Sequence, residues 1–210
     1  MKISKTSQIL TALFSLACAI AAGYLILRGS GMFPEPSISL ILLTAIFIIL
    51  LSSSRKSFYL ILLPLVCLHA FYTPTGLNFG APSYQYIASV LATDMLETKE
   101  FLLQIPVSSY LAALAIPLLV FLHYKSAVKF GVKFYRNKTF IALATLLIGY
   151  NLPIAAPLKE TIDSTAKIVD EWQKLKKMSQ ESNWGQSTLE NSKYQDYVII
   201  LGESARKDYL

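Results

Sequence analysis

The stretch Ile9–Leu27, with the sequence ILTALFSLACAIAAGYLIL, decides the class of fold. It contains no charged residue, and a helix needs about 20 predominantly apolar residues to cross a bilayer. Lys2 and Lys5 precede it and Arg28 follows it. We therefore expect Ile9–Leu27 to be a membrane-spanning helix.

Four further apolar segments follow the same pattern, and none of them contains Asp, Glu, Lys or Arg. The absence is informative, because one charge at mid-bilayer costs about 2.5–3.5 kcal/mol on insertion scales. We predict an all-α polytopic membrane domain over residues 1–158. Its five transmembrane helices are expected at about 9–27, 37–54, 57–73, 107–123 and 139–158.

The composition excludes the ordinary soluble classes. Apolar residues make up 54% of the chain and charged residues 15%, whereas about a quarter of an average soluble domain is charged. The basic residues lie in short gaps between apolar segments, which excludes a nucleic-acid-binding protein with a basic soluble face. Cys18 and Cys67 lie inside apolar segments and have neither a disulfide framework nor a metal-binding spacing.

The loops between the spans set the orientation, because basic residues favour the cytoplasmic side. Nine lie on one side: Lys2, Lys5, Arg55, Lys56, Lys125, Lys129, Lys133, Arg136 and Lys138. The opposite loops contain Arg28 and Lys99. The N-terminus is therefore predicted in the cytoplasm. Residues after Leu158 are expected on the opposite side of the membrane, which in a bacterium is the periplasm or the cell exterior.

Two features of this arrangement have a second interpretation. Lys2, Lys5 and Ala19–Ala21 also fit a signal peptide, whose removal would leave four spans and the same location for the tail. We favour an uncleaved anchor, because the apolar run continues to Leu27. The inward loop His123–Lys138 alternates lysines with aromatic residues, which marks topology and can also bind anionic headgroups.

The segment between the third and fourth spans, Tyr72–Pro106, is predicted as a long outward loop. Pro and Gly residues at 74, 76, 80 and 82 favour turns. After them, a helix is expected at about 84–103, with Tyr84 and Tyr86 at its start, as in interfacial helices. This helix either caps the bundle or forms one wall of a lipid-substrate site.

His69 and Asn151 are the polar side chains singled out within the predicted spans. Ionisable residues inside a membrane are functional candidates by default. We expect His69 near the outer end of the third span, where water is close, and this position favours a structural role.

Beyond Leu158 the pattern becomes amphipathic. Lys159–Met178 has apolar residues at helical spacing, which predicts a bridging helix along the outer surface. The bridging helix and a polar linker together occupy 159–193.

The last residues, 194–210, predict the start of a different domain. Tyr197–Leu201 is apolar and β-branched, as in a buried strand of an α/β sheet. Glu203, Ser204 and Arg206 follow it. The carboxyl end of such a strand is where α/β folds place ligand chemistry, and a carboxylate suits a divalent metal. Ser204 does not fit the nucleophile elbow GxSxG, because residue 206 is Arg.

The motif YVIILGESARKDYL, residues 197–210, and the segment ATDMLETKEFL, residues 92–102, resemble the membrane-bound phosphoethanolamine transferases of Gram-negative bacteria. This family belongs to the alkaline phosphatase and sulfatase superfamily. The resemblance implies that Glu203 is an acidic ligand of the catalytic zinc. Ser204 and Arg206 match neighbouring motif residues, to which no role is assigned. The threonine nucleophile and the other zinc ligands would lie beyond Leu210, so the chain is expected to be an inactive N-terminal fragment of such an enzyme.

The resemblance also implies a reaction. Phosphoethanolamine would pass from phosphatidylethanolamine, through a phospho-enzyme intermediate, to a hydroxyl of lipid A, core sugar or another periplasmic glycan. Two alternatives stay open: a glycerol-phosphate transferase of the lipoteichoic acid synthase type, and a non-catalytic membrane subunit.

Overall fold

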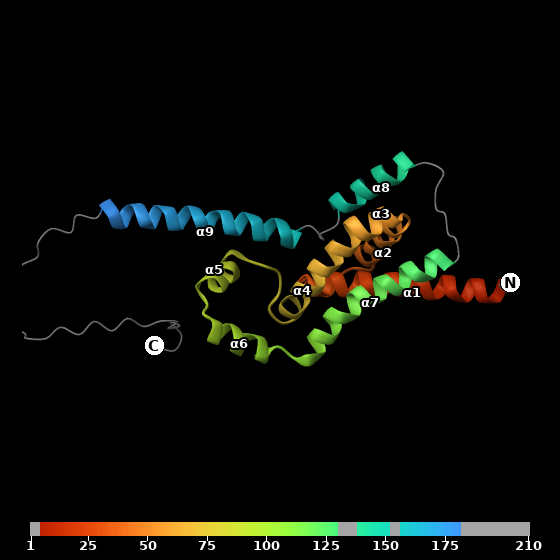
Figure 1. The fold of residues 1–210 in the computed structure, drawn as a ribbon, viewed down its shortest axis with the longest axis horizontal. Helices are drawn as coiled ribbons and strands as arrows, with labels where there is room; N and C mark the ends of the chain where they lie inside the picture. Colours follow the sequence, from red (N-terminus) through yellow and green to blue (C-terminus); the bar gives the residue numbers. More distant parts are fainter. Residues whose placement is uncertain (1–4, 130–137, 152–155, 182–210) are drawn as a thin grey trace, which may run out of the picture. The chain divides into compact units, whose positions relative to one another are not determined.

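A computed structural model describes residues 5–129, 138–151 and 156–181 of this chain, and its regular elements are helices (Figure 1). They are α1 (Lys5–Gly29), α2 (Ile38–Ser52), α3 (Arg55–Ser57), the π-helical turn η1 (Phe58–Leu62), α4 (Leu63–Phe79), α5 (Tyr84–Ala92), α6 (Met95–Gln104), α7 (Val107–Lys129), α8 (Lys138–Asn151) and α9 (Ala156–Glu181). The predicted strand at 197–201 lies outside the described residues.

Helix α1 is the centre of the bundle. It packs against α2, α4 and α7, while α4 also packs against α7 and α8 packs against α2. Small or branched side chains fill the contacts: Ala19, Ala22, Ala45, Ile48, Val66, Ile116 and Val120. Small residues suit this position, because helices in lipid are held by close packing rather than by exclusion of water.

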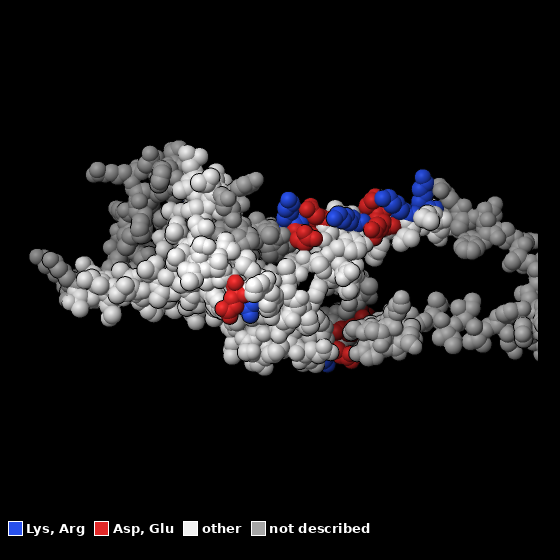
Figure 2. All heavy atoms as spheres, turned by 180° about the vertical axis from the view of Figure 1, so that it is seen from behind, with Lys and Arg blue, Asp and Glu red and all other residues white. Residues whose placement is uncertain are grey.

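The sides of these helices that face away from the bundle are also apolar. Leu60 is 74% exposed, Phe71 is 87% exposed and Leu114 is 69% exposed. The visible face of the bundle in Figure 2 carries few charged atoms. In water such a surface would be a large exposed apolar patch, whereas in a bilayer it faces lipid. The predicted all-α membrane domain is therefore confirmed in its broad form.

The number of spans is confirmed in part. Among the described residues, three helical segments are long and apolar enough to cross a membrane: Thr6–Gly29, Arg55–Phe79 and Val107–Val128. Helix α2 is apolar but has 15 residues, which extend about 22 Å at 1.5 Å per residue, less than the hydrocarbon core of about 30 Å. Helix α8 ends at Asn151. The second and fifth spans therefore stay predictions.

The third span is longer than predicted. The helix runs from Arg55 to Phe79 through α3, η1 and α4, so Pro74 and Gly76 lie inside it rather than in a loop. Side chains supply hydrogen bonds beside the proline: Thr73 Oγ1 donates to His69 O (2.7 Å), and Asn78 Nδ2 donates to Pro74 O (2.7 Å). Such contacts let a membrane helix tolerate proline. The helix ends at Gly80, whose φ is 92°.

The single helix predicted at 84–103 is wrong in one respect, because the chain breaks at Thr93 and Asp94. Thr93 is extended, and the Asp94 carboxylate accepts hydrogen bonds from the backbone N–H groups of Leu96 and Glu97, both at 2.8 Å. An aspartate that satisfies free N–H groups in this way begins a new helix. The segment therefore forms two helices, α5 and α6.

A helix is present where the bridging helix is predicted, and it is longer than predicted. Helix α9 extends from Ala156 to Glu181, instead of from Lys159 to Met178. The chain divides into two compact units, Met1–Glu171 and Trp172–Leu210, so the boundary lies within α9. Of the second unit, the structure describes the helical residues Trp172–Glu181.

Candidate functional site

Two polar contacts on α1 define the two ends of the bundle. At one end, Ser15 lies between α1 and α7, with its Oγ and its carbonyl O each 2.9 Å from His123 Nδ1. Because the carbonyl accepts only, His123 Nδ1 carries a proton and donates it. At the other end, Ser30 Oγ lies 3.0 Å from His69 Nδ1 on α4. We call these the Ser15 end and the Ser30 end.

At the Ser30 end, glycines bring the turns between helices together. Gly31 has a φ of 85°, and a Cβ there would lie 2.1 Å from the Gly80 carbonyl carbon. A Cβ on Gly76 would lie 1.9 Å from Gly29 O. Both distances exclude a side chain without backbone movement. The end of α4 is therefore held against the end of α1, and this contact fixes where α5 begins.

Three aromatic side chains gather where α4 ends, and we call them the Phe79 cluster: Phe79, Tyr86 and Phe101. The Phe79 ring stacks on Phe101 at 5.0 Å and lies 6.1 Å from Tyr86. Aromatic pairs at these separations contribute about 0.5–1.5 kcal/mol beyond burial. The cluster therefore ties α5 and α6 to α4.

Hydrogen bonds add to these ring contacts. Tyr72 Oη donates to Gly80 O at 2.7 Å, and Tyr110 Oη donates to Leu102 O at 2.7 Å. Asn78 Nδ2 donates to Ser109 Oγ at 2.9 Å, which joins α4 to the start of α7. The Ser30 end is thus a polar and aromatic rim around an apolar bundle.

The two candidate tyrosines of α5 have different neighbours. Ser83 begins α5 by accepting a hydrogen bond from Tyr86 N. The Tyr84 hydroxyl donates to the Glu171 carboxylate on α9. Tyr86 instead belongs to the Phe79 cluster, so the pair does not form one continuous wall.

Their environments act on both phenols in the same direction. The hydrogen bond to Glu171 raises the pKa of Tyr84, and partial burial raises the pKa of Tyr86. Both hydroxyls are therefore protonated donors at neutral pH. A protonated phenol can donate to a phosphate or ester oxygen.

Other side chains of α5 and α6 are apolar and exposed. Val90 is 66% exposed, Met95 is 87% exposed and Leu103 is 75% exposed. Among the described residues, no group of three or more His, Cys, Asp or Glu side chains could hold a metal ion. The arrangement can bind an amphipathic molecule, and it offers no metal site of its own within those residues.

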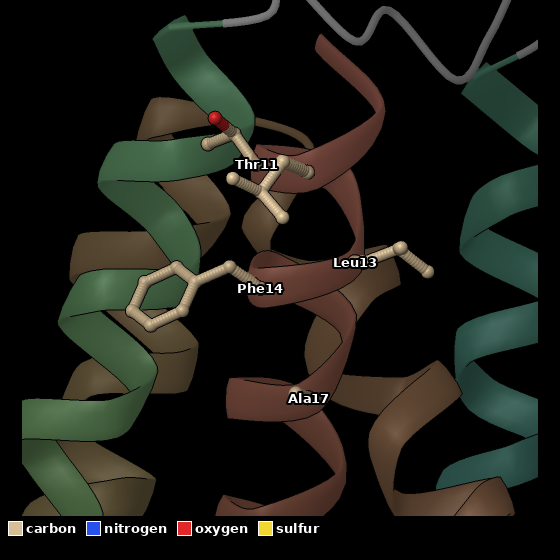
Figure 3. A pocket seen from close by; sticks show the side chains of 5 residues that line it. Thr11, Leu13, Phe14 and Ala17 are labelled. Carbon is tan, nitrogen blue, oxygen red and sulfur yellow. The ribbon is translucent and has the colours of Figure 1, made fainter. Parts of the chain in front are cut away.

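A hollow lies beside the first half of α1, away from these tyrosines. Leu10, Thr11, Leu13, Phe14 and Ala17 line it (Figure 3). The Thr11 hydroxyl is already used, because it donates to Ser7 O at 2.9 Å. The lining contains no titratable group, and its chemistry is that of a surface against acyl chains.

The remaining predicted site residues have mixed outcomes. Glu203, Ser204 and Arg206 lie outside the described residues, as does the side chain of Asn151. His69 lies near the predicted end of its span, but it is 5% exposed and bonded to Ser30 rather than open to water.

Two site residues were missed by sequence reasoning. The predicted fourth span ends and the inward loop begins at His123, so this residue is not a predicted site residue, although it continues the buried stripe of Ile116 and Val120 at helical spacing. The Tyr84–Glu171 contact joins residues 87 positions apart, and no local pattern could have indicated it.

Comparison with known proteins gives this geometry its context. The chain is 78% identical over 205 residues to a Haemophilus influenzae protein named "Putative phosphoethanolamine transferase". The phosphoethanolamine transferases are the family of this chain. The alignment covers 98% of the chain but 42% of that relative, so the chain spans less than half of its length.

A more distant phosphoethanolamine transferase, OpgE of Escherichia coli, is 26% identical over 162 residues. These are 67% of this chain and 30% of the relative. No family model matches the chain, and no solved structure matches it.

Proposed function

We propose that this chain is the membrane-embedded part of an enzyme that transfers phosphoethanolamine from phosphatidylethanolamine to a hydroxyl of lipid A, core sugar or another periplasmic glycan. The observation that carries the proposal is the 78% identity over nearly the whole chain. The helices support it, because an apolar bundle keeps an enzyme beside a donor lipid that resides in the bilayer.

The Ser30 end is the proposed entrance for that donor. Exposed apolar residues of α5 and α6 suit its glycerol and acyl region, and the Tyr86 hydroxyl suits its ester and phosphate oxygens. The Tyr84 hydroxyl already donates to Glu171, so Tyr84 would contribute its ring to the wall of the entrance. The Phe79 cluster would hold both helices in position. Orientation of a substrate by such contacts lowers the barrier that a later chemical step must cross.

Zinc at Glu203 is proposed from the resemblance alone. A zinc site needs three or four ligands, and the described residues contain no group of three or more side chains that could form one. When bound, zinc would polarise a phosphoryl oxygen. The described side chains act before that step, by binding and orienting the lipid.

The proposal is tested with the gene that encodes this chain and whatever coding sequence follows codon 210. It is expressed in a Gram-negative host that lacks its own phosphoethanolamine transferases. Mass spectrometry should find phosphoethanolamine on lipid A, core sugar or a periplasmic glycan. Glycerol phosphate on the acceptor would favour the rival transferase, and no modification would contradict both.

Two variants separate the chemical role of Glu203 from lipid binding. Glu203→Ala should abolish transfer and lower zinc content together, whereas Glu100→Ala, an exposed carboxylate on α6, should leave both unchanged. Phe101→Ala should raise the KM for phosphatidylethanolamine while zinc content stays constant. Full zinc and a normal rate in Glu203→Ala would refute the ligand assignment.

A further inference from the structure

Three aromatic residues join η1 to α7 at the Ser15 end, and we call them the Tyr59 trio: Phe58, Tyr59 and Tyr124. Phe58 stacks on Tyr124 with centroids 3.8 Å apart, and Tyr59 meets Phe58 at 5.0 Å and Tyr124 at 6.0 Å. Phe58 is fully buried, whereas Tyr59 is 42% exposed. The Tyr59 ring is therefore the exposed member of the trio, where η1 meets α7.

Two cations flank this trio. The Arg55 guanidinium lies 6.0 Å from the Tyr59 ring centroid, and Lys125 Nζ lies 5.3 Å from the ring of Phe121. Lys125 follows Tyr124 in sequence, so the two cations come from elements that the trio holds together. Both side chains are exposed.

Within residues 5–129, which include both cations, no carboxylate lies at the Ser15 end. Between residues 5 and 129 the acids are Glu35, Asp94, Glu97 and Glu100. Glu35 follows α1, and the other three lie in or beside α6. All four therefore belong to segments at the Ser30 end, so residues 5–129 supply no carboxylate beside the cations at the Ser15 end, and an anion from outside this segment can pair with them.

The surroundings of the cations are apolar. Leu60 is 74% exposed beside Tyr59, and Phe121 is 42% exposed beside Lys125. A ligand for this surface must combine a negative headgroup with a long apolar part. Basic residues between membrane helices at the cytoplasmic side recognise anionic lipid headgroups in this way.

We propose that the Ser15 end binds one anionic phospholipid of the cytoplasmic leaflet, of the phosphatidylglycerol class. Its phosphate lies between Arg55 and Lys125, and its acyl chains lie along Leu60 and Phe121. The ring of Tyr59 supports Arg55 by a cation–π contact. This proposal does not depend on the transferase reaction, because it concerns the opposite end of the bundle.

The test measures thermal unfolding of the 210-residue chain in a neutral detergent, titrated with phosphatidylglycerol or with phosphatidylcholine. Phosphatidylglycerol should raise the midpoint temperature of unfolding, and phosphatidylcholine should not. In the variant Arg55→Gln/Lys125→Gln, the lipid concentration for a half-maximal rise should increase about thirtyfold, since each of the two basic residues near a lipid surface contributes about 1 kcal/mol. The control Lys99→Gln/Lys167→Gln removes the same charge elsewhere and should behave as the unchanged chain.

Further arms separate the sources of the effect. Soluble glycerol 1-phosphate should not raise the midpoint, and 0.5 M salt should weaken the preference of the unchanged chain by screening. If the double variant does not fold, Lys125→Gln alone and the salt titration test the proposal. The proposal would be overturned if both lipids raised the unfolding temperature equally or if glycerol 1-phosphate raised it as much. It would also be overturned if the control variant lost as much lipid affinity as Arg55→Gln/Lys125→Gln.

Discussion

At the scale of single residues, Tyr84 shows how one hydroxyl can link distant parts of the chain. It stands at the first position of α5, and its partner Glu171 lies 87 residues later on α9. The hydrogen bond raises the pKa of Tyr84 because loss of the proton would place two negative charges side by side. The contact is therefore present below the ordinary tyrosine pKa and is lost as the pH rises through the raised pKa.

We predict that Tyr84 titrates at a higher pH than an ordinary tyrosine and that Glu171 causes the shift. The difference in tyrosinate absorbance between the unchanged chain and Tyr84→Phe isolates this titration. In Glu171→Gln the midpoint should fall towards the ordinary value, because the neighbouring carboxylate is gone. A midpoint that does not move in Glu171→Gln would show that the two side chains do not meet.

Gly76 is the second residue with a distinct consequence. A Cβ there would meet Gly29 O at 1.9 Å, whereas a Cβ on Gly149 would meet Phe47 Cε2 at 3.1 Å. Backbone cannot move aside as an aromatic ring can. We expect Gly76→Ala to destabilise the bundle by about 1–3 kcal/mol, the usual cost of overpacking, and Gly149→Ala to cost less. Thermal unfolding in detergent measures both, and equal midpoints would contradict the close approach of α1 and α4.

At the scale of elements, the positions of the helices could be predicted from the apolar runs more accurately than the residues at which the helices end. Uncharged stretches identified α1 and α7, because exclusion of charge acts on every residue of a span. The ends depend on single contacts. Asp94 was readable as a helix cap, with Glu97 three residues later, and splits the predicted helix. Pro74 favoured a turn, yet Thr73 and Asn78 supply the hydrogen bonds that keep α4 continuous.

The candidate site was predictable to a smaller extent. Tyr84 and Tyr86 were found because tyrosines at the start of an outward helix mark a membrane interface. Their different partners were not predictable, since Glu171 and Phe79 approach them only through the fold. His69 was recognised, but its burial depends on Ser30, 39 residues away.

Helix α9 also supports a prediction of its own. Ile162, Val169 and Trp172 are exposed by 58%, 48% and 60%, and they lie on one side of the helix. The charged residues other than Lys176 lie on the other side, and Figure 2 shows blue and red atoms together along one edge of α9. A helix with this pattern lies in a membrane surface with its apolar side buried.

We predict that Trp172 enters the lipid interface. In a Trp184→Phe background, its fluorescence should shift to the blue on reconstitution and be quenched by brominated lipid. The matched control is Trp172→Phe/Lys167→Trp in the same background, which moves the indole to the charged side and should remain in water. Equal quenching of both would contradict an orientation set by the apolar side.

At the scale of the whole molecule, the contacts sort the ends of the helices into two groups. The Ser15–His123 contact and the Tyr59 trio place the start of α1, the turn after α2 and the end of α7 together. Arg55, Lys56 and Lys125 lie in that group. The grouping agrees with the loop charges, which predict that this end faces the cytoplasm.

We therefore expect alkaline phosphatase fused after Lys138 to be inactive and the same enzyme fused after Glu181 to be active, because it folds only outside the cytoplasm. Green fluorescent protein at the same two positions should give the opposite result. Activity after Lys138 without activity after Glu181 would reverse the orientation.

The central position of α1 has a consequence for how the protein is made. Ribosomes release α1 first, but Ser30 must wait for a partner 39 residues later and Ser15 for one 108 residues later. Membrane helices insert individually and associate afterwards. The nascent α1 therefore resides in lipid without its two histidine contacts until α4 and then α7 arrive, although the Ser30 hydroxyl already donates to Ile26 O of the same segment. The bundle then closes first at the Ser30 end. Synthesis that stops before His123 leaves a membrane intermediate open at the Ser15 end, a natural substrate for membrane quality control.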